Sequence, residues 1–221
     1  MYKTVDISVE NYRLLIYNNV ATCLYLPLII LLLNFTGNLY SFGKKRTYIE
    51  LILAVAEILK YVRFQRTLKI AKKKFTIRNL LKSMITCGVS IIIFHVAAIL
   101  FGAPFLSEQY ETLCFATLMM VLTILPVCLY LDSDIYTLFS SLLDFDGNKL
   151  QEYFLTNIRF TMFGAWLGAV VIPLDWNKPY QDWPIPCCYG AMLGCFVGNL
   201  FLILQFIKYG NFTNKKGRFG L

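Results

Sequence analysis

The sequence predicts an all-α membrane protein, a single bundle of six transmembrane helices over residues 1–221. Hydrophobic residues make up 57% of the chain and charged residues 15%, whereas soluble domains average about 45–50% and 25%. The apolar residues gather in long blocks, and a helix needs about 20 of them to cross a bilayer. Little chain remains between the blocks, so a separate soluble catalytic domain of the usual ~100–150 residues does not fit.

The first two blocks, residues 14–33 and 47–61, differ in length and in the number of charged residues they contain. Residues 14–33 are strongly apolar and lack an A-x-A-like cleavage site, so we expect a retained signal anchor. Residues 47–61 are short and carry Glu50, Glu57 and Lys60, which are costly inside lipid. This second block either crosses the membrane among its neighbours or lies at the interface, and in the latter case five spans remain.

Residues 60–82 form a basic segment with nine Lys or Arg and no acidic residue. Its apolar residues recur every three or four positions, which is typical of an amphipathic helix lying on a membrane. Without this segment the chain has nearly equal numbers of basic and acidic residues. The charge therefore predicts contact between a cytosolic segment and anionic lipid, and it argues against a nucleic-acid-binding protein.

The other four spans cover residues 83–101, 112–131, 158–174 and 186–207. With six spans, the two termini, the basic segment and the 132–159 loop share a side that carries 17 Lys or Arg, and the other side carries four. The positive-inside rule places the richer side in the cytosol. With five spans the split is 18 to three and the amino terminus moves to the other side. Both arrangements agree after Lys60.

No set of residues in the sequence resembles a catalytic or metal centre. His95 is the only histidine, and it lies in the middle of a span. A single histidine makes neither a zinc site nor a triad, and no H-E-x-x-H, G-x-S-x-G or C-x-x-C motif occurs. We predict no metal and no cofactor, and we expect His95 to be a buried polar residue with a hydrogen-bond partner, a more frequent role than proton relay.

Small residues at a spacing of four mark the last two spans. Such spacing gives a helix face without side chains, on which a second helix can pack closely. The spacing does not say whether the contact is within the chain or with another chain. The glycines concerned are Gly164 and Gly168 in the fifth span and Gly190, Gly194 and Gly198 in the sixth.

The loop of residues 173–186 is rich in proline and aromatic residues and must be stiff and non-helical. Its aromatic rings suit the headgroup level of a membrane, and they suit a protein contact equally well. We keep both interpretations. The residues that we expect to meet a partner here are Pro173, Asp175, Trp176, Trp183 and Pro184.

Five short stretches resemble one family. They are FHV at residues 94–96, FGAP at 101–104, GAWLGA at 164–169, IPLDW at 172–176 and WPI at 183–185. This linear series resembles the phosphatidylinositol-glycan biosynthesis class F (PIG-F) family.

The resemblance implies a multi-pass protein of the endoplasmic-reticulum membrane that acts in the synthesis of glycosylphosphatidylinositol (GPI) anchors. Members are similar to a non-catalytic stabilising subunit of the large ethanolamine-phosphate transferases of class O and class G. Those enzymes transfer ethanolamine phosphate from phosphatidylethanolamine to mannoses of the lipid-linked glycan. The resemblance supplies no catalytic residues.

Our hypothesis is that the glycine faces of the last two spans dock on membrane helices of the transferase. The two lumenal loops, with Gly102 and Pro104 in the first and the Asp-Trp and Trp-Pro pairs in the second, would brace its lumenal side. One alternative is a small membrane enzyme or lipid transporter that acts alone, using His95, Asp175 and Asp182 on a lipid phosphate. Another is a scaffold that self-associates through the same glycines.

Overall fold

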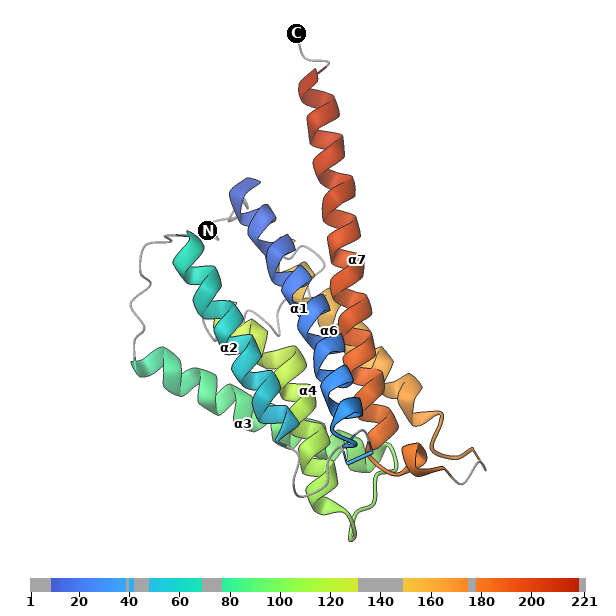
Figure 1. The fold of residues 1–221 in the computed structure, drawn as a ribbon. Helices are drawn as coiled ribbons and strands as arrows, with labels where there is room; N and C mark the ends of the chain where they lie inside the picture. Colours follow the sequence, from blue (N-terminus) through green and yellow to red (C-terminus); the bar gives the residue numbers. More distant parts are fainter. Residues whose placement is uncertain are drawn as a thin grey trace.

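The computed structural model describes residues 9–38, 40–41, 48–68, 77–130, 149–174 and 178–218, which form a bundle of long helices (Figure 1). In chain order these are α1 Val9–Phe35, α2 Ile49–Leu68, α3 Ile77–Leu100, α4 Gln109–Tyr130, α6 Lys149–Ala169 and α7 Ile185–Arg218, and the short 3-10 helix η1 Pro179–Gln181 precedes α7. The described residues contain no strand. The predicted all-α class is confirmed.

Successive long helices run in opposite directions, so the start of α1 and the end of α7 lie at the same end of the bundle (Figure 1). The turns that follow α1, α3 and α6 lie at the opposite end. The helix α2, which carries the weak second span, lies lengthwise beside α1 and α4 rather than across the bundle. This arrangement matches the one expected for six spans.

Four helices are long and apolar enough to cross a membrane, over Leu15–Phe35, Ile77–Leu100, Gln109–Tyr130 and Ile185–Lys208. The helices α2 and α6 are not among them, because both carry more charge. Each is packed along its length, α2 against α4 and α1, and α6 against α7 and α4. Whether α2 crosses the bilayer stays a prediction.

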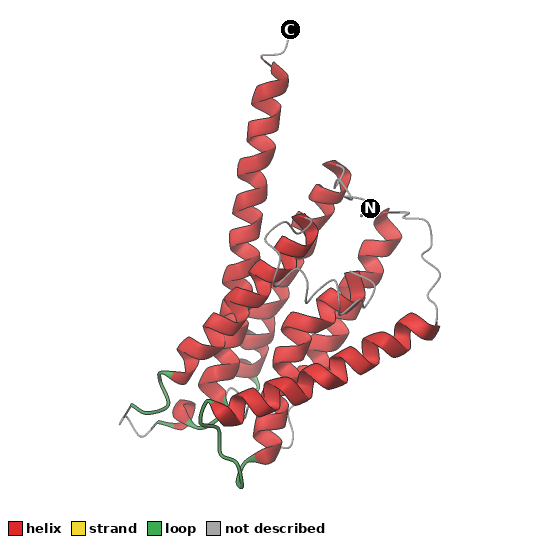
Figure 2. Cartoon of the chain, turned by 180° about the vertical axis from the view of Figure 1, so that it is seen from behind, coloured by secondary structure: helices red, strands yellow, loops and turns green. Residues whose placement is uncertain are grey.

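The core lies where α4 faces α1, α2 and α7. Its most deeply buried side chains are apolar and come from all four helices: Leu26, Leu53, Leu118, Leu122 and Met192. The helix α3 stands apart from this core. It packs mainly on α4, buries only Ser90 and Ala98, and tilts away from the other helices (Figure 2).

Each long helix begins or ends beyond the predicted apolar block, and the extensions of α2 and α6 place charged residues inside a helix. The helix α2 continues to Leu68, into the basic segment, while residues 69–76 of that segment lie outside the described residues. The helix α6 begins at Lys149, before the predicted start of the fifth span at residue 158. As a result Arg159, expected at the end of a cytosolic loop, lies well inside α6. The start of α6 was not visible in the sequence, because hydropathy marks only the apolar part of a helix and not its start.

Candidate functional site

The helices α6 and α7 touch backbone to backbone at Gly164, Gly190 and Gly194. A Cβ atom added to Gly164 would overlap the carbonyl oxygen of Gly190 and lie 2.8 Å from the Cα of Gly194. A Cβ added to Gly194 would in turn overlap the carbonyl oxygen of Phe160 and lie 3.0 Å from the Cα of Gly164. Only glycine fits at these positions.

Gly168 and Gly198 extend the same contact toward both ends. A Cβ on Gly168 would lie 2.8 Å from the carbonyl carbon of Pro186, and one on Gly198 would lie 2.9 Å from the Cβ of Phe160. All five predicted glycines therefore join α6 to α7 inside this chain. Gly164, Gly194 and Gly198 are buried, so another helix reaches them only if α6 and α7 separate. Direct docking of a partner on the glycines stays a prediction, and the structure gives them an internal use.

The loop between α6 and α7 is held by Gln181, which is buried. Its side-chain amide donates to the carbonyl oxygens of Val171 (3.0 Å) and Leu174, and its Oε1 atom accepts from the backbone N–H of Lys178 (2.9 Å). One side chain thus ties three points of the loop together. The hydrogen bonds of Gln181 therefore add to the stiffness that the prolines are predicted to give this loop.

Trp183 fastens this loop to the start of α4. Its indole N–H donates to the hydroxyl oxygen of Thr112 (3.0 Å), and its ring centroid lies 5.4 Å from that of Phe115. Pro184, which follows in a cis peptide, is buried, whereas Pro173 is exposed. Asp182 is also exposed. Trp183 and Pro184 are thus packed in the chain, while the predicted partner residues Asp175 and Trp176 lie outside the described residues.

Gly102, predicted to meet a partner, closes the end of α3. It has φ +104°, its N–H bonds to the carbonyl of Ile99 (3.0 Å), and the next N–H, of Ala103, bonds to the carbonyl of Ala98 (3.0 Å). This pair of bonds with a left-handed residue is a Schellman cap, which favours glycine. Pro104 follows it, half-buried.

His95 lies on α3 and is half-buried. Its Nδ1 atom is buried and has no hydrogen-bond partner in the described part of the chain. The sequence-based expectation of a satisfied side chain is therefore wrong for this atom. Among the described helices α3 packs mainly on α4, which limits the polar groups within reach.

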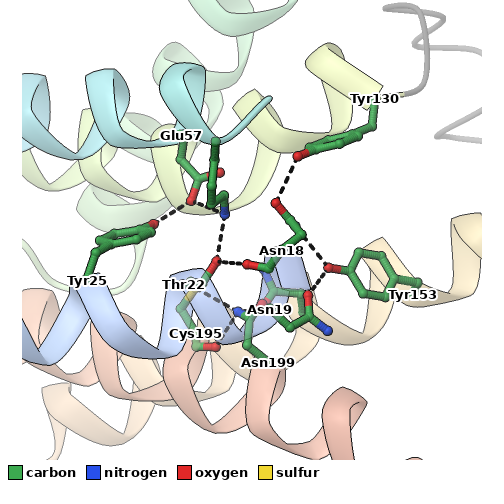
Figure 3. A network of polar contacts seen from close by, with 11 residues as sticks. Asn18, Asn19, Thr22, Tyr25, Glu57, Tyr130, Tyr153, Cys195 and Asn199 are labelled. Atoms are coloured by element: carbon green, nitrogen blue, oxygen red, sulfur yellow. Dashed lines mark hydrogen bonds and ion pairs between the residues drawn. The ribbon is translucent and has the colours of Figure 1, made fainter. Parts of the chain in front are cut away.

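A buried charge pair joins α2 to α1, as Figure 3 shows. Lys60 Nζ lies 2.8 Å from Glu57 Oε1 and donates to the hydroxyl oxygen of Thr22 at 2.6 Å, and the hydroxyl of Tyr25 donates to the same Glu57 oxygen. Glu57 is only 2% exposed. The pair brings together two opposite charges of α2 that lie inside the bundle. From the sequence alone these two charges argued against a membrane-crossing helix, because hydropathy along the chain does not show that residues of α1 bind them.

Two tyrosines continue these polar contacts to α4 and α6 (Figure 3). The hydroxyl of Tyr130 donates to Asn18 Oδ1 (2.9 Å), the amide of Asn18 donates to the hydroxyl oxygen of Tyr153 (3.4 Å), and that hydroxyl donates to Asn19. Sequence analysis missed this cluster, since lone Asn and Tyr residues carry no motif. The sequence feature that could have predicted the cluster is the presence of several polar side chains within spans, because such side chains usually pair with one another.

The last polar contact of the bundle joins α6 to α7. The amide of Asn199 donates to Asn157 Oδ1 (3.0 Å) and to the carbonyl oxygen of Cys195 (2.7 Å). We call the full set the polar cluster. It links five helices, α1, α2, α4, α6 and α7, and it comprises Asn18, Asn19, Thr22, Tyr25, Glu57, Lys60, Tyr130, Tyr153, Asn157, Cys195 and Asn199.

The polar cluster holds the helices together through hydrogen bonds. Membrane hydrogen bonds between helices contribute about 0.6 kcal/mol each on average, so several together hold a bundle firmly. Among the described residues no group of three or more His, Cys, Asp or Glu is placed to hold a metal ion. Within the polar cluster two buried atoms, Glu57 Oε2 and Asn19 Nδ2, have no partner among the described residues.

Comparison with known proteins gives a consistent result. The model of the GPI biosynthesis protein family Pig-F matches residues 5–202. A protein of Yarrowia lipolytica named "Glycosylphosphatidylinositol anchor biosynthesis protein 11" is 39% identical over 113 residues, 50% of this chain and 48% of that protein.

A human protein named "GPI ethanolamine phosphate transferase, stabilizing subunit" is 35% identical over 126 residues, 55% of this chain and 56% of that protein. The mouse protein of the same name is 33% identical over 122 residues. The chain spans about half the length of the curated relatives it matches. No solved structure matches it.

Proposed function

Because the chain belongs to the GPI biosynthesis protein family Pig-F, we propose that it is a non-catalytic stabilising subunit of a GPI ethanolamine-phosphate transferase. The observation that carries the proposal is the similarity to the human and mouse proteins, both of which are named as stabilizing subunits of GPI ethanolamine phosphate transferase. The large partners in this proposal are the multi-pass transferases of class O and class G, and the membrane is that of the endoplasmic reticulum.

The bundle is well suited to support another membrane protein. Its helices are tied by the polar cluster and by the glycine contact of α6 with α7, so the chain offers rigid surfaces to a partner. A rigid surface loses less conformational freedom on binding than a mobile one. Stabilisation by such a subunit needs no chemistry of its own.

The connection between α6 and α7 supports a brace on the lumenal side. By the positive-inside rule it belongs to that side, where the family resemblance implies that the transferases carry their catalytic domain. Gln181 and Trp183 fix the loop from within, while Pro173 and Asp182 remain exposed at its surface. In this proposal the exposed residues meet the partner, and the buried residues hold them in place.

Depletion of the chain tests the proposal. If the chain stabilises a transferase, its removal from cells shortens the half-life of the transferase protein while transferase mRNA is unchanged. Re-expression of the wild-type chain restores the half-life. An unchanged half-life together with lipid turnover by the purified chain alone would favour instead an enzyme or transporter that acts on lipid phosphates.

A further inference from the structure

Arg159 lies on α6 at the level of Gly198 on α7. Its neighbour Phe160 packs against Gly198, where an added Cβ would lie 2.9 Å from the Phe160 Cβ. Gly198 lies nine residues before the end of the apolar run at residues 186–207, which is about 14 Å along a helix. Since the hydrocarbon is about 30 Å thick, residues 159 and 160 lie near its centre.

The side chain of Arg159 is exposed at that depth. A charged arginine at the centre of a membrane helix costs about 2.5–3.5 kcal/mol on insertion scales. Snorkelling relieves such a charge near the edge of the hydrocarbon, whereas the level of Gly198 lies about 14 Å from the end of the 186–207 run. Lipid alone is a poor environment for this residue.

Within the described ranges no acidic side chain pairs with Arg159. Lys60, another cation inside the bundle, does have partners. Glu57 lies 2.8 Å from its Nζ atom, and the hydroxyl of Thr22 accepts a further hydrogen bond from it. No corresponding partner for Arg159 is found among the described residues of the bundle. An acceptor from outside would supply it.

The surroundings of Arg159 have the composition of a binding surface. At spacings of three, four and seven residues it is followed by exposed Met162, Phe163 and Trp166, and Val170 continues the row. The rings of Phe163 and Trp166 stack with centroids 5.8 Å apart, and the two side chains are 56% and 55% exposed. Arginine and tryptophan are enriched among the residues that dominate interface energies.

This row lies opposite the glycines on α6. Gly164 and Gly168 face α7, and at 100° per residue Arg159, Phe163 and Trp166 point away from that contact. Seen from behind, α6 lies on the outside of the bundle (Figure 2). We call the row Arg159, Met162, Phe163, Trp166 and Val170 the outer face of α6.

We propose that the outer face of α6 binds a transmembrane helix of the transferase, and that this helix presents an Asp or Glu carboxylate to Arg159. The inference rests on the proposed function for the identity of the partner. Arginine suits the role, because its guanidinium pairs with a carboxylate through two parallel hydrogen bonds. The aromatic pair fills the contact on the side nearer the turn to α7.

Two other occupants fit the charge less well. A phospholipid keeps its phosphate at the membrane surface, about 15 Å from the centre, so it does not reach Arg159. A second copy of the chain in a two-fold contact places the same surface on both sides, which brings Arg159 toward its own copy. Two like charges in a medium of low dielectric repel strongly.

Photo-crosslinking tests the surface. A photoreactive phenylalanine analogue replaces Phe163 in the full-length tagged chain, with Leu28 on α1 and Ile92 on α3 as control positions that are equally exposed, at 57% and 65%. We expect an adduct from position 163 to a transferase transmembrane peptide that contains Asp or Glu, and little adduct from the controls. Adducts from position 163 only to lipid or to a second copy overturn the proposal.

Substitution of Arg159 gives an independent measurement. Arg159→Leu should lower the transferase that co-purifies with the chain at least about tenfold, the change that 1.4 kcal/mol produces, and Arg159→Lys should lower it less. The thermal midpoint of the isolated Arg159→Leu chain should not fall, since the described residues offer this side chain no hydrogen bond or ion pair that the substitution would remove. If as much transferase co-purifies with Arg159→Leu as with the wild-type chain, binding of the transferase at the outer face of α6 is refuted, while the stabilising role is unaffected. Wild-type chain that retains no transferase refutes the stabilising role itself.

Discussion

The glycine contact between α6 and α7 makes its strongest prediction at Gly194. In Gly194→Ala the new methyl group overlaps the carbonyl oxygen of Phe160 and lies 3.0 Å from the Cα of Gly164, and both are backbone atoms. Backbone cannot turn aside as a flexible side chain can, so the two helices must move apart. Overpacking of this kind costs about 1–3 kcal/mol.

Gly88 provides the matched control, because it also lies inside a membrane helix and has no atom within 4 Å of the place where a Cβ would stand. Replacing glycine with alanine in a helix by itself stabilises by about 0.5–1 kcal/mol. Both substitutions gain this amount, so the difference between them isolates the packing cost.

The assay is thermal unfolding of the two purified variants in the same mild detergent. At about 2–4 °C per kcal/mol for a chain of this size, Gly194→Ala should unfold about 2–12 °C below Gly88→Ala. Equal midpoints would refute the backbone contact. Loss of the transferase from Gly194→Ala with an unchanged midpoint would instead favour the glycines as a docking face.

Three further predictions follow from the site, each read out as a thermal midpoint in detergent. Glu57→Ala leaves the Lys60 charge buried without its partner and should cost about 3–5 kcal/mol, whereas the double variant Glu57→Leu with Lys60→Met should cost much less; equal losses would mean that the pair is not coupled. Trp183→Phe keeps a ring but loses the hydrogen bond to Thr112, which should lower stability by about 0.5–1.5 kcal/mol, and Thr112→Val should add little to it. Gly102→Ala forces a side chain into the left-handed conformation and should cost about 1–2 kcal/mol, and an unchanged midpoint would contradict the cap.

The sequence predicts the helices well because crossing a bilayer demands long apolar runs, which hydropathy detects directly. It also predicts the close approach at Gly164 and Gly194, since spacing alone places these glycines on one face. It does not say which helix fills that face, because two helices of one chain and helices of two chains need the same residues. The structure supplies that answer for α6 and α7.

Charged residues mark the limit of sequence reasoning here. Glu57 and Lys60 look like evidence against a membrane helix, and the structure pairs them with each other and with Thr22. Arg159 looks like the end of a loop, and the structure places it deep in α6. In each case the meaning of a charge depends on its neighbours in space, which hydropathy along the chain does not report.

The measurement that tests the central claim most directly is purification of the tagged full-length chain in mild detergent, followed by quantification of the proteins that accompany it. A stabilising subunit should carry an equimolar ethanolamine-phosphate transferase, and the chain separated from it should show no turnover of lipid substrates. A chain that elutes alone, folded and active on lipid phosphates would contradict the account.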